Sequence, residues 1–316
     1  MTSSLFEAGL SVIVTPEAVI QQDQFDVVDA YLKREGVQWP IYVVGTCPRV
    51  VIVDGSIAKG NDGFILSVNI GAPGNQSFER HFHIQGPPVP DDVELISRSP
   101  FRVLTTQKDG QDIQHVKISD LLRDSAEELR RIRVCYIGQA VGDGEDYTVI
   151  NRLSSHSTLQ QIYFDVANNE PHLEVCIIPC SIEPYYLGLI LPNATEEGEE
   201  DDLVSRMRTH LTENTFPDRQ LVNLGEAALI RHFQPRYNSM YTKNFPDEAH
   251  VGYKEAYLAR YNAILAELCG EEMDLTFYND VVSPMDHVLA QYSLLSEADR
   301  ISMLDPKTWF FHYQNI

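Results

Sequence analysis

A single acid stands out in the segment GEAALIRHFQPRYN, because Glu226 opens an otherwise apolar helical pattern. Pro235 ends this helix, and Tyr237 and Asn238 follow in a turn. A carboxylate on the first turn can simply complement the positive end of the helix dipole. Alternatively, it can bind a hard divalent cation through its oxygens. The residues that the fold brings near Glu226 decide between these interpretations.

Other pairs of residues also have spacings that could serve chemistry. Arg152 and His156 are four residues apart in the helical segment VINRLSSHSTLQQIYFD, so we expect both on one helix face. His81 and His83 alternate in RHFHIQ and would face one side of a strand, where they could bind metal, but no third ligand is nearby. The loop GDGED, 142–146, lacks the spaced ligands and the distal glutamate of a calcium loop. The arginine and histidine pair is the stronger candidate.

The composition is that of a globular chain. It has 316 residues, 43% of them hydrophobic, which is enough for two compact domains or for one with large additions. No run is as long and apolar as a membrane span, and the N-terminal residues MTSSLFEAGLSVIV lack the features of a signal peptide. The five cysteines are scattered, and Cys176 and Cys180 are isolated from other soft ligands. We therefore expect a reduced, cytoplasmic protein with no membrane partner.

The pattern over residues 1–118 predicts a β-rich α+β accessory domain. Short apolar or alternating runs separated by glycine and proline are typical of strands and turns. These runs are IYVVG, RVVIVDG, FILSVNIG, RHFHIQG and FRVLTT. The segment QFDVVDAYLKRE has helical spacing and ends at Gly36.

Helices and strands are expected to alternate over residues 119–245. A polar helix over 119–132, with Ser119 or Asp120 as its N-cap, would precede the strand RVCYIG and the helix that carries Arg152. After these come the strand HLEVCIIPC, a solvated acidic loop (EEGEEDD), and the helices LVSRMRTHL and LGEAALIRHF.

Residues 246–316 are expected to form a mainly helical C-terminal extension. The segment YKEAYLARYNAILAELCG predicts a clear helix that ends at Gly270. The segment that follows, DLTFYNDVV to DHVLAQYSLL, fits either strands or a helix.

The order of these elements and the residues they carry resembles the GIY-YIG endonuclease superfamily over roughly residues 130 to 245. Tyr136-Ile137-Gly138 matches the second half of the family's name. The resemblance implies an α+β fold, in which a small central antiparallel sheet flanked by helices lies between the β-rich N-terminal domain and the helical extension. It implies these catalytic residues: Tyr136, Arg152, His156 and Glu226.

The resemblance also implies cofactor, substrate and function. Glu226 would hold Mg²⁺ or Mn²⁺, and Gly138, Gln139, Arg236 and Asn238 would contact substrate. The implied function is metal-dependent hydrolysis of phosphodiester bonds in nucleic acid, chiefly DNA, in the setting of bacterial antiviral defence. The alternative is a catalytically inactive module that serves as a binding or scaffold subunit.

One expected tyrosine is missing. The family's Gly-Ile-Tyr strand usually comes shortly before the second motif, but here that interval is LLRDSAEELRR. The strands FRVLTTQKDG and QHVKI are alternatives, and neither contains a tyrosine. A register with Tyr136 in the first motif and Tyr147 in the second leaves no Tyr-x-Gly, and we reject it. Tyr147, or Tyr237 beside Asn238, could substitute for the missing residue.

The formal net charge of −22 opposes binding to a polyanion. Local cations surround the expected site, and they are Arg131, Arg133, Arg152, Arg231 and Arg236. We therefore expect weak binding of naked nucleic acid by the isolated chain, and a basic protein partner or a homo-oligomer that supplies the missing positive charge.

Overall fold

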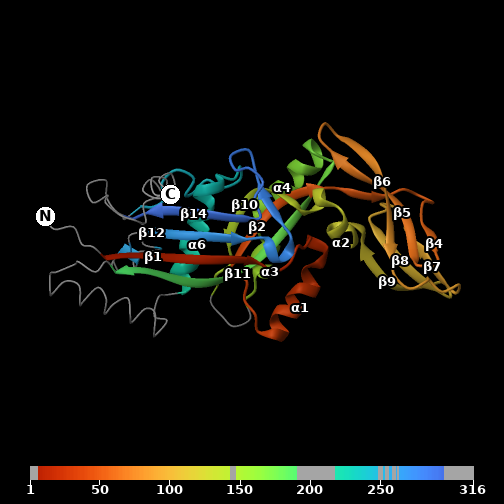
Figure 1. The fold of residues 1–316 in the computed structure, drawn as a ribbon, viewed down its shortest axis with the longest axis horizontal. Helices are drawn as coiled ribbons and strands as arrows, with labels where there is room; N and C mark the ends of the chain where they lie inside the picture. Colours follow the sequence, from red (N-terminus) through yellow and green to blue (C-terminus); the bar gives the residue numbers. More distant parts are fainter. Residues whose placement is uncertain are drawn as a thin grey trace, which may run out of the picture. The chain divides into compact units, whose positions relative to one another are not determined.

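Two compact units make up the chain (Figure 1). The computed structural model describes residues 6–142, 147–190, 218–247, 252, 256–257, 261 and 263–294, without the side chains of 6–8 and 185–190. Unit 1 comprises Met1–Gly45, Val134–His156 and Ile177–Ile316, and unit 2 comprises Thr46–Arg133 and Ser157–Cys176. Each unit is therefore assembled from segments that are separated in the sequence, and neither follows the expected boundaries after residues 118 and 245.

A seven-stranded sheet forms the framework of unit 1. Its strands, in their spatial order, are β13 (Thr276–Tyr278), β10 (Arg131–Gln139), β2 (Ile41–Pro48), β11 (Leu173–Ile190), β1 (Phe6–Pro16), β12 (Ala263–Cys269) and β14 (His287–Ser293). Strand β1 pairs antiparallel with β11 and parallel with β12, and β12 pairs antiparallel with β14. Strands from both ends of the chain thus lie side by side in one sheet (Figure 1).

Three α-helices of unit 1 bear on the site. Helix α1 (Phe25–Glu35) ends at Gly36 with φ +65°, as the sequence predicted. Helix α3 (Val149–Ser154) is short, and helix α6 (Asp218–Phe233) packs against β1, β12 and β14. The close approach of α6 to the sheet depends on Gly225, where a Cβ atom would lie 3.2 Å from the side chains of both Val12 and Ile41.

Two small sheets and a separate core form unit 2. One sheet contains β3 (Val50–Ile52), β4 (Ala58–Gly60), β5 (Gly63–Ala72) and β6 (Gln76–Gln85), and the other contains β7 (Val93–Ile96), β8 (Val103–Lys108) and β9 (Gln111–Lys117). Helix α2 (Ile118–Leu122), the 3₁₀ turns η2 (Arg123–Ser125) and η3 (Glu127–Arg130), and helix α4 (Ser157–Asn169) complete it. Leu66, Val68, Phe82 and Leu122 are among the residues of its apolar core.

The predicted fold class was wrong. The sheet that carries Tyr136 is not small and central but has seven strands, and the described part of the C-terminal region adds β12, β13 and β14 to it. The segment AILAELC was assigned to a helix because alanine, leucine and glutamate favour helices. In the fold it lies between β1 and β14, where Ala263–Ala266 are all buried, so tertiary packing overrides that local preference.

Two predicted helices are also interrupted. The helix expected over 119–132 begins at Ile118, so neither Ser119 nor Asp120 is its N-cap, and it gives way to 3₁₀ turns where Asp124 and Ser125 are poor helix formers. The helix expected to carry Arg152 and His156 together breaks after Ser154. In that break the Ser154 hydroxyl bonds to the Ile150 carbonyl oxygen, one of the local alternatives that serine offers the backbone.

Some predicted segments lie outside the described residues. They are the acidic loop Glu196–Asp202, the helix LVSRMRTHL and residues 143–146 of the loop GDGED. In the part of the chain that the structure describes, no helix has both the length and the apolar character needed to cross a membrane.

Candidate active site

Strand β2 places a tyrosine directly beside the Tyr-Ile-Gly segment of β10. The Ala140 amide donates to the Pro40 carbonyl oxygen at 2.8 Å, and a Cβ atom on Gly138 would lie 2.6 Å from the Tyr42 hydroxyl oxygen. Strands β2 and β10 are neighbours in the sheet, and these contacts place the Tyr42 side chain against Gly138. Position 138 must be glycine because the Tyr42 side chain occupies the space that any Cβ would need.

Three rings cluster at this point of the sheet. The centre of the His156 ring lies 5.1 Å from the centre of the Tyr136 ring and 6.0 Å from that of the Tyr42 ring. The centres of the two tyrosine rings are 6.2 Å apart. Tyr42 is fully buried, and its hydroxyl interacts with Arg152 and Tyr136, although neither contact has standard hydrogen-bond geometry. A buried hydroxyl in that state is a strong candidate to bond a ligand or a water molecule.

Glu226 lies in the middle of α6, and the expectation that it starts a helix was wrong, because α6 begins at Asp218. Its side chain is buried, at 7% exposure, so the simple interpretation as a surface acid also fails. The Gln139 side-chain amide donates to Glu226 Oε2 at 2.8 Å. Burial raises the pKa of Glu226 to about 7, although Gln139 and the charge of Arg152 both oppose the rise.

Arg152 is the cation of this site. Thr148 at the start of α3 donates its amide to Asn151 Oδ1 at 2.7 Å and its hydroxyl to Asp29 of α1 at 2.6 Å, which fixes the short helix that carries Arg152. The arginine side chain is exposed, and no described carboxylate forms an ion pair with it. Its charge acts on Tyr42, Tyr136 and Glu226 alike, since it lowers the pKa of each against the effect of burial.

The buried imidazole of His156 completes the group. Burial, together with the nearby Arg152 charge, lowers the pKa of His156, so the ring is neutral at physiological pH. The helix break after Ser154 does not remove His156 from the site, because its ring still contacts both tyrosines.

The structure thus brings together the four residues predicted to be catalytic. It adds Tyr42, which was not predicted, because the first motif was expected between residues 101 and 136 and not in the strand Ile41–Pro48. The signal was present in the strand Ile41–Pro48, where Ile-Tyr follows Pro40. Most of unit 2 lies between Tyr42 and Tyr136 in the sequence.

The residues predicted to bind substrate have more varied surroundings. Gln139 holds Glu226, and Gly138 makes room for Tyr42. Both amide atoms of Asn238 bond to the Ile137 backbone, at 2.9 and 2.8 Å, so this side chain fixes the turn after α6 against β10. Arg236 is exposed, and its guanidinium lies 5.3 Å from the centre of the Tyr237 ring.

The other cations expected near the site are engaged elsewhere. Arg131 pairs with Glu127 and Arg133 with Glu170, all four in unit 2. Arg231 donates to the Thr242 carbonyl oxygen at 2.6 Å. Of the five, Arg152 and Arg236 form no ion pair with a described carboxylate, and Arg152 interacts with the Tyr42 hydroxyl.

The remaining candidates do not form one site. His81 bonds to Ser67 Oγ at 2.6 Å and His83 pairs with Asp62 at 3.0 Å, so the two histidines serve separate contacts. Tyr147, one possible substitute for the missing tyrosine, packs against Gly142. An open cavity of about 380 Å³ is lined by Pro40, Ala140 and the first turns of α6, and Ala140 directly follows Gln139 in the sequence.

Comparisons with known proteins give no relative for this chain: no protein-family model matches it, and no curated protein or solved structure matches it significantly.

Proposed function

We propose that the chain is a metal-dependent endonuclease that hydrolyses phosphodiester bonds in nucleic acid, with DNA as the expected substrate. The observation that supports this best is the grouping of Tyr42, Tyr136, His156 and Arg152 around the buried carboxylate of Glu226. The proposed likeness to the GIY-YIG enzymes is confined to these side chains, because the sheet around them differs from the expected one.

Arg152 has the properties of a phosphate ligand. Its side chain is exposed and forms no ion pair with a described carboxylate, so the planar donors that do not interact with the Tyr42 hydroxyl can bind the oxygens of a phosphodiester. Because its positive charge already acts on Glu226, it would also stabilise the extra negative charge that develops on the phosphate oxygens during attack.

His156 is the best candidate for the general base. Its neutral imidazole can accept a proton at physiological pH. The pKa values of Tyr42 and Tyr136 are raised, first of all by burial, so both phenols stay protonated and act as hydrogen-bond donors. In this scheme the histidine takes a proton from the attacking water, and the tyrosine hydroxyls orient that water and the phosphate.

The surroundings of Glu226 fit a hard divalent cation. Mg²⁺ and Mn²⁺ bind well to one carboxylate together with water and phosphate oxygens. Glu226 offers that carboxylate, and Gln139 fixes its orientation through one oxygen. When bound there, the cation would supply Lewis-acid stabilisation of the leaving oxygen.

Nicking of supercoiled plasmid in the presence of Mg²⁺ or Mn²⁺ tests the proposal. We expect activity from the natural chain and its loss in Glu226→Gln and Arg152→Ala. Arg34→Ala is a matched control, because Arg34 is also an exposed helical arginine of unit 1 but is in α1. Equal residual activity in the natural chain and in Glu226→Gln would assign the cleavage to a contaminant or to another site.

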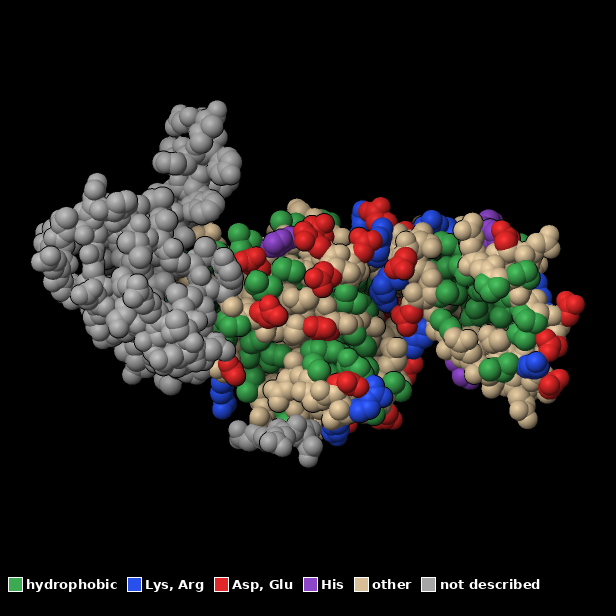
Figure 2. Space-filling model, turned by 60° about the horizontal axis from the view of Figure 1, so that its bottom comes forward, with side chains coloured by type: hydrophobic (Ala, Val, Ile, Leu, Met, Phe, Trp, Pro, Cys, Tyr) green, Lys and Arg blue, Asp and Glu red, His purple; other side chains and the backbone are tan. Residues whose placement is uncertain are grey.

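The second candidate is a catalytically inactive binding subunit. Burial of Tyr42 and Glu226 favours it, because a substrate phosphate must reach these groups. The charge of −22 favours it as well, and on the face that Figure 2 draws, acidic side chains are spread over the described residues, with lysine and arginine in small groups. Specific binding of a protein partner without any cleavage, under all divalent cations tested, would select this candidate.

A further inference from the structure

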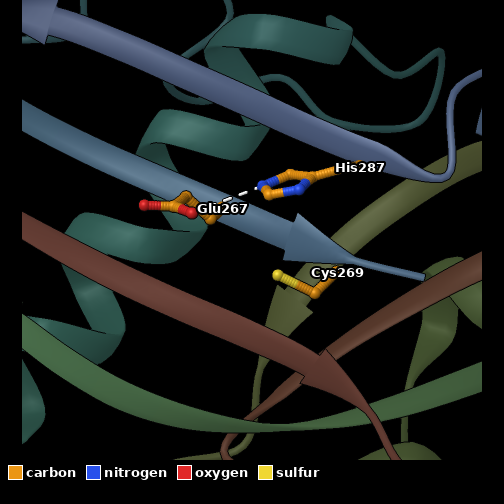
Figure 3. A group of neighbouring side chains, drawn as sticks. All are labelled: Glu267, Cys269 and His287. Carbon is orange, nitrogen blue, oxygen red and sulfur yellow. Dashed lines mark hydrogen bonds and ion pairs between the residues drawn. The ribbon is translucent and has the colours of Figure 1, made fainter. Parts of the chain in front are cut away.

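A second group of side chains that could bind a metal lies on β12 and β14. These two strands are at the opposite end of the seven-stranded sheet from β10. Glu267 and Cys269 are two residues apart on β12, so their side chains project from the same face. The antiparallel register places His287 of β14 opposite Cys269. One ligand atom from each of the three residues lies within 4.8 Å of the other two, and Figure 3 shows His287 directed at Glu267 across the strand pair.

The carboxylate of this group is held in place before any cation binds. The buried hydroxyl of Ser11 on β1 donates to Glu267 Oε1 at 2.8 Å. The other oxygen, Oε2, is left 3.3 Å from His287 Nε2. Metal-binding carboxylates are commonly oriented by such a hydrogen bond from a neighbouring group.

The spacing of the ligand atoms agrees with a tetrahedral ion. Zinc binds nitrogen and oxygen at about 2.0–2.1 Å, so two such ligands at the tetrahedral angle are about 3.4 Å apart. The observed separation between Glu267 Oε2 and His287 Nε2 is 3.3 Å. A zinc–sulfur bond is slightly longer, at about 2.3 Å. The Cys269 sulfur lies within 4.8 Å of the ligand atoms of Glu267 and His287, which leaves room for this longer bond.

The electrostatic surroundings favour a cation. Glu271 lies 3.8 Å from His287 Nδ1, and Glu272 follows it in the 3₁₀ turn η5 (Glu271–Met273), so two carboxylates besides Glu267 are close to the group. A bound divalent cation would offset this concentration of negative charge and stabilise the thiolate. The exposed side of His287 leaves room for water as a fourth ligand.

We propose that Glu267, Cys269 and His287 form a binding site for Zn²⁺ or a cation of the same class. The mixed oxygen, sulfur and nitrogen ligands select zinc over magnesium and calcium, which take oxygen ligands alone. In the described sheet β14 is the edge strand. The ion would therefore tie this edge strand to β12, and the site is independent of the proposed nuclease function.

Titration with Co²⁺, a spectroscopic substitute for Zn²⁺, tests the proposal on the full chain. We expect a thiolate-to-cobalt charge-transfer band at one equivalent of Co²⁺, and loss of that band on addition of Zn²⁺. Cys269→Ser and His287→Gln should each abolish the band. Ser11→Ala removes only the orienting hydrogen bond and should weaken the affinity for Zn²⁺ by about 10- to 100-fold.

Glu272→Gln is the matched control. It removes a negative charge beside Glu271, but Glu272 is not one of the three ligands, so the band should persist. Absence of the band in the natural chain would overturn the proposal, even if a variant fails to fold. An undiminished band in Cys269→Ser or His287→Gln would overturn it as well.

Discussion

Replacement of the buried acid Glu226 by glutamine should stabilise the metal-free protein at alkaline pH. The pKa of Glu226 is raised from 4.5 to about 7, so the folded state holds this proton more tightly than the unfolded state. The stability it contributes is complete below pH 4.5 and is lost as the pH rises through 7. At about 1.4 kcal/mol per pKa unit, the loss amounts to about 3 kcal/mol.

Urea unfolding between pH 5.5 and 8.5 measures this effect. The range avoids the isoelectric point of about 4.7, where the chain is least soluble, and it retains about 2 kcal/mol of the difference. Glutamine keeps an oxygen that can accept from Gln139, so Glu226→Gln should lose about 2 kcal/mol less stability than the natural chain over this range. Asp280→Asn, which removes an exposed carboxylate of unit 1, should follow the natural chain.

Divalent cation should remove most of this stability difference at high pH. Mn²⁺ at 100 times its dissociation constant stabilises the folded state by about 2.7 kcal/mol, and it should do so only where Glu226 is present. If the natural chain and Glu226→Gln show the same pH dependence, Glu226 is not desolvated as the structure indicates, and the reasoning is refuted.

Three further outcomes are expected. Gly138→Ala should cost about 1–3 kcal/mol of unfolding free energy, because its Cβ would collide with Tyr42; an unchanged urea midpoint would contradict the register of β2 and β10. Asn238→Ala should cost about 1–3 kcal/mol by leaving the Ile137 backbone without partners, and a loss of cleavage without a loss of stability would instead indicate a role in substrate binding. In the nicking assay, kcat/KM at fixed subsaturating Mn²⁺ should rise with pH up to about 7 as Glu226 ionises, and a flat profile would exclude it as the metal ligand.

Much of the local structure could be predicted from the sequence. The helix that ends at Gly36 and the strands IYVVG and RVCYIG are confirmed, because their local patterns agree with their tertiary environment. The helix LGEAALIRHF is confirmed except for its start, which is at Asp218. The order of Tyr136, Arg152, His156 and Glu226 was also enough to select residues that the fold brings together. Their catalytic role stays a prediction.

The partner strands could not be predicted, because strand pairing depends on contacts between distant segments. Tyr42 lies beside Gly138 only because β2 and β10 are neighbours in the sheet, although most of unit 2 separates them in the sequence. The Glu267 and Cys269 pair shows the same limit. In the predicted helix these side chains would point about 200° apart, whereas in a strand they share a face, and only the pairing with β14 adds His287.

The sequence by itself determined which residue types are available for chemistry and most of the short elements that carry them, since these follow from local periodicity and capping. The tertiary structure alone decided that Glu226 is buried in mid-helix with a raised pKa, that Tyr42 joins Tyr136 and His156, and that the C-terminal segment AILAELC is a strand. The physical reason is that burial and strand pairing depend on segments far away in the chain, which no local pattern records.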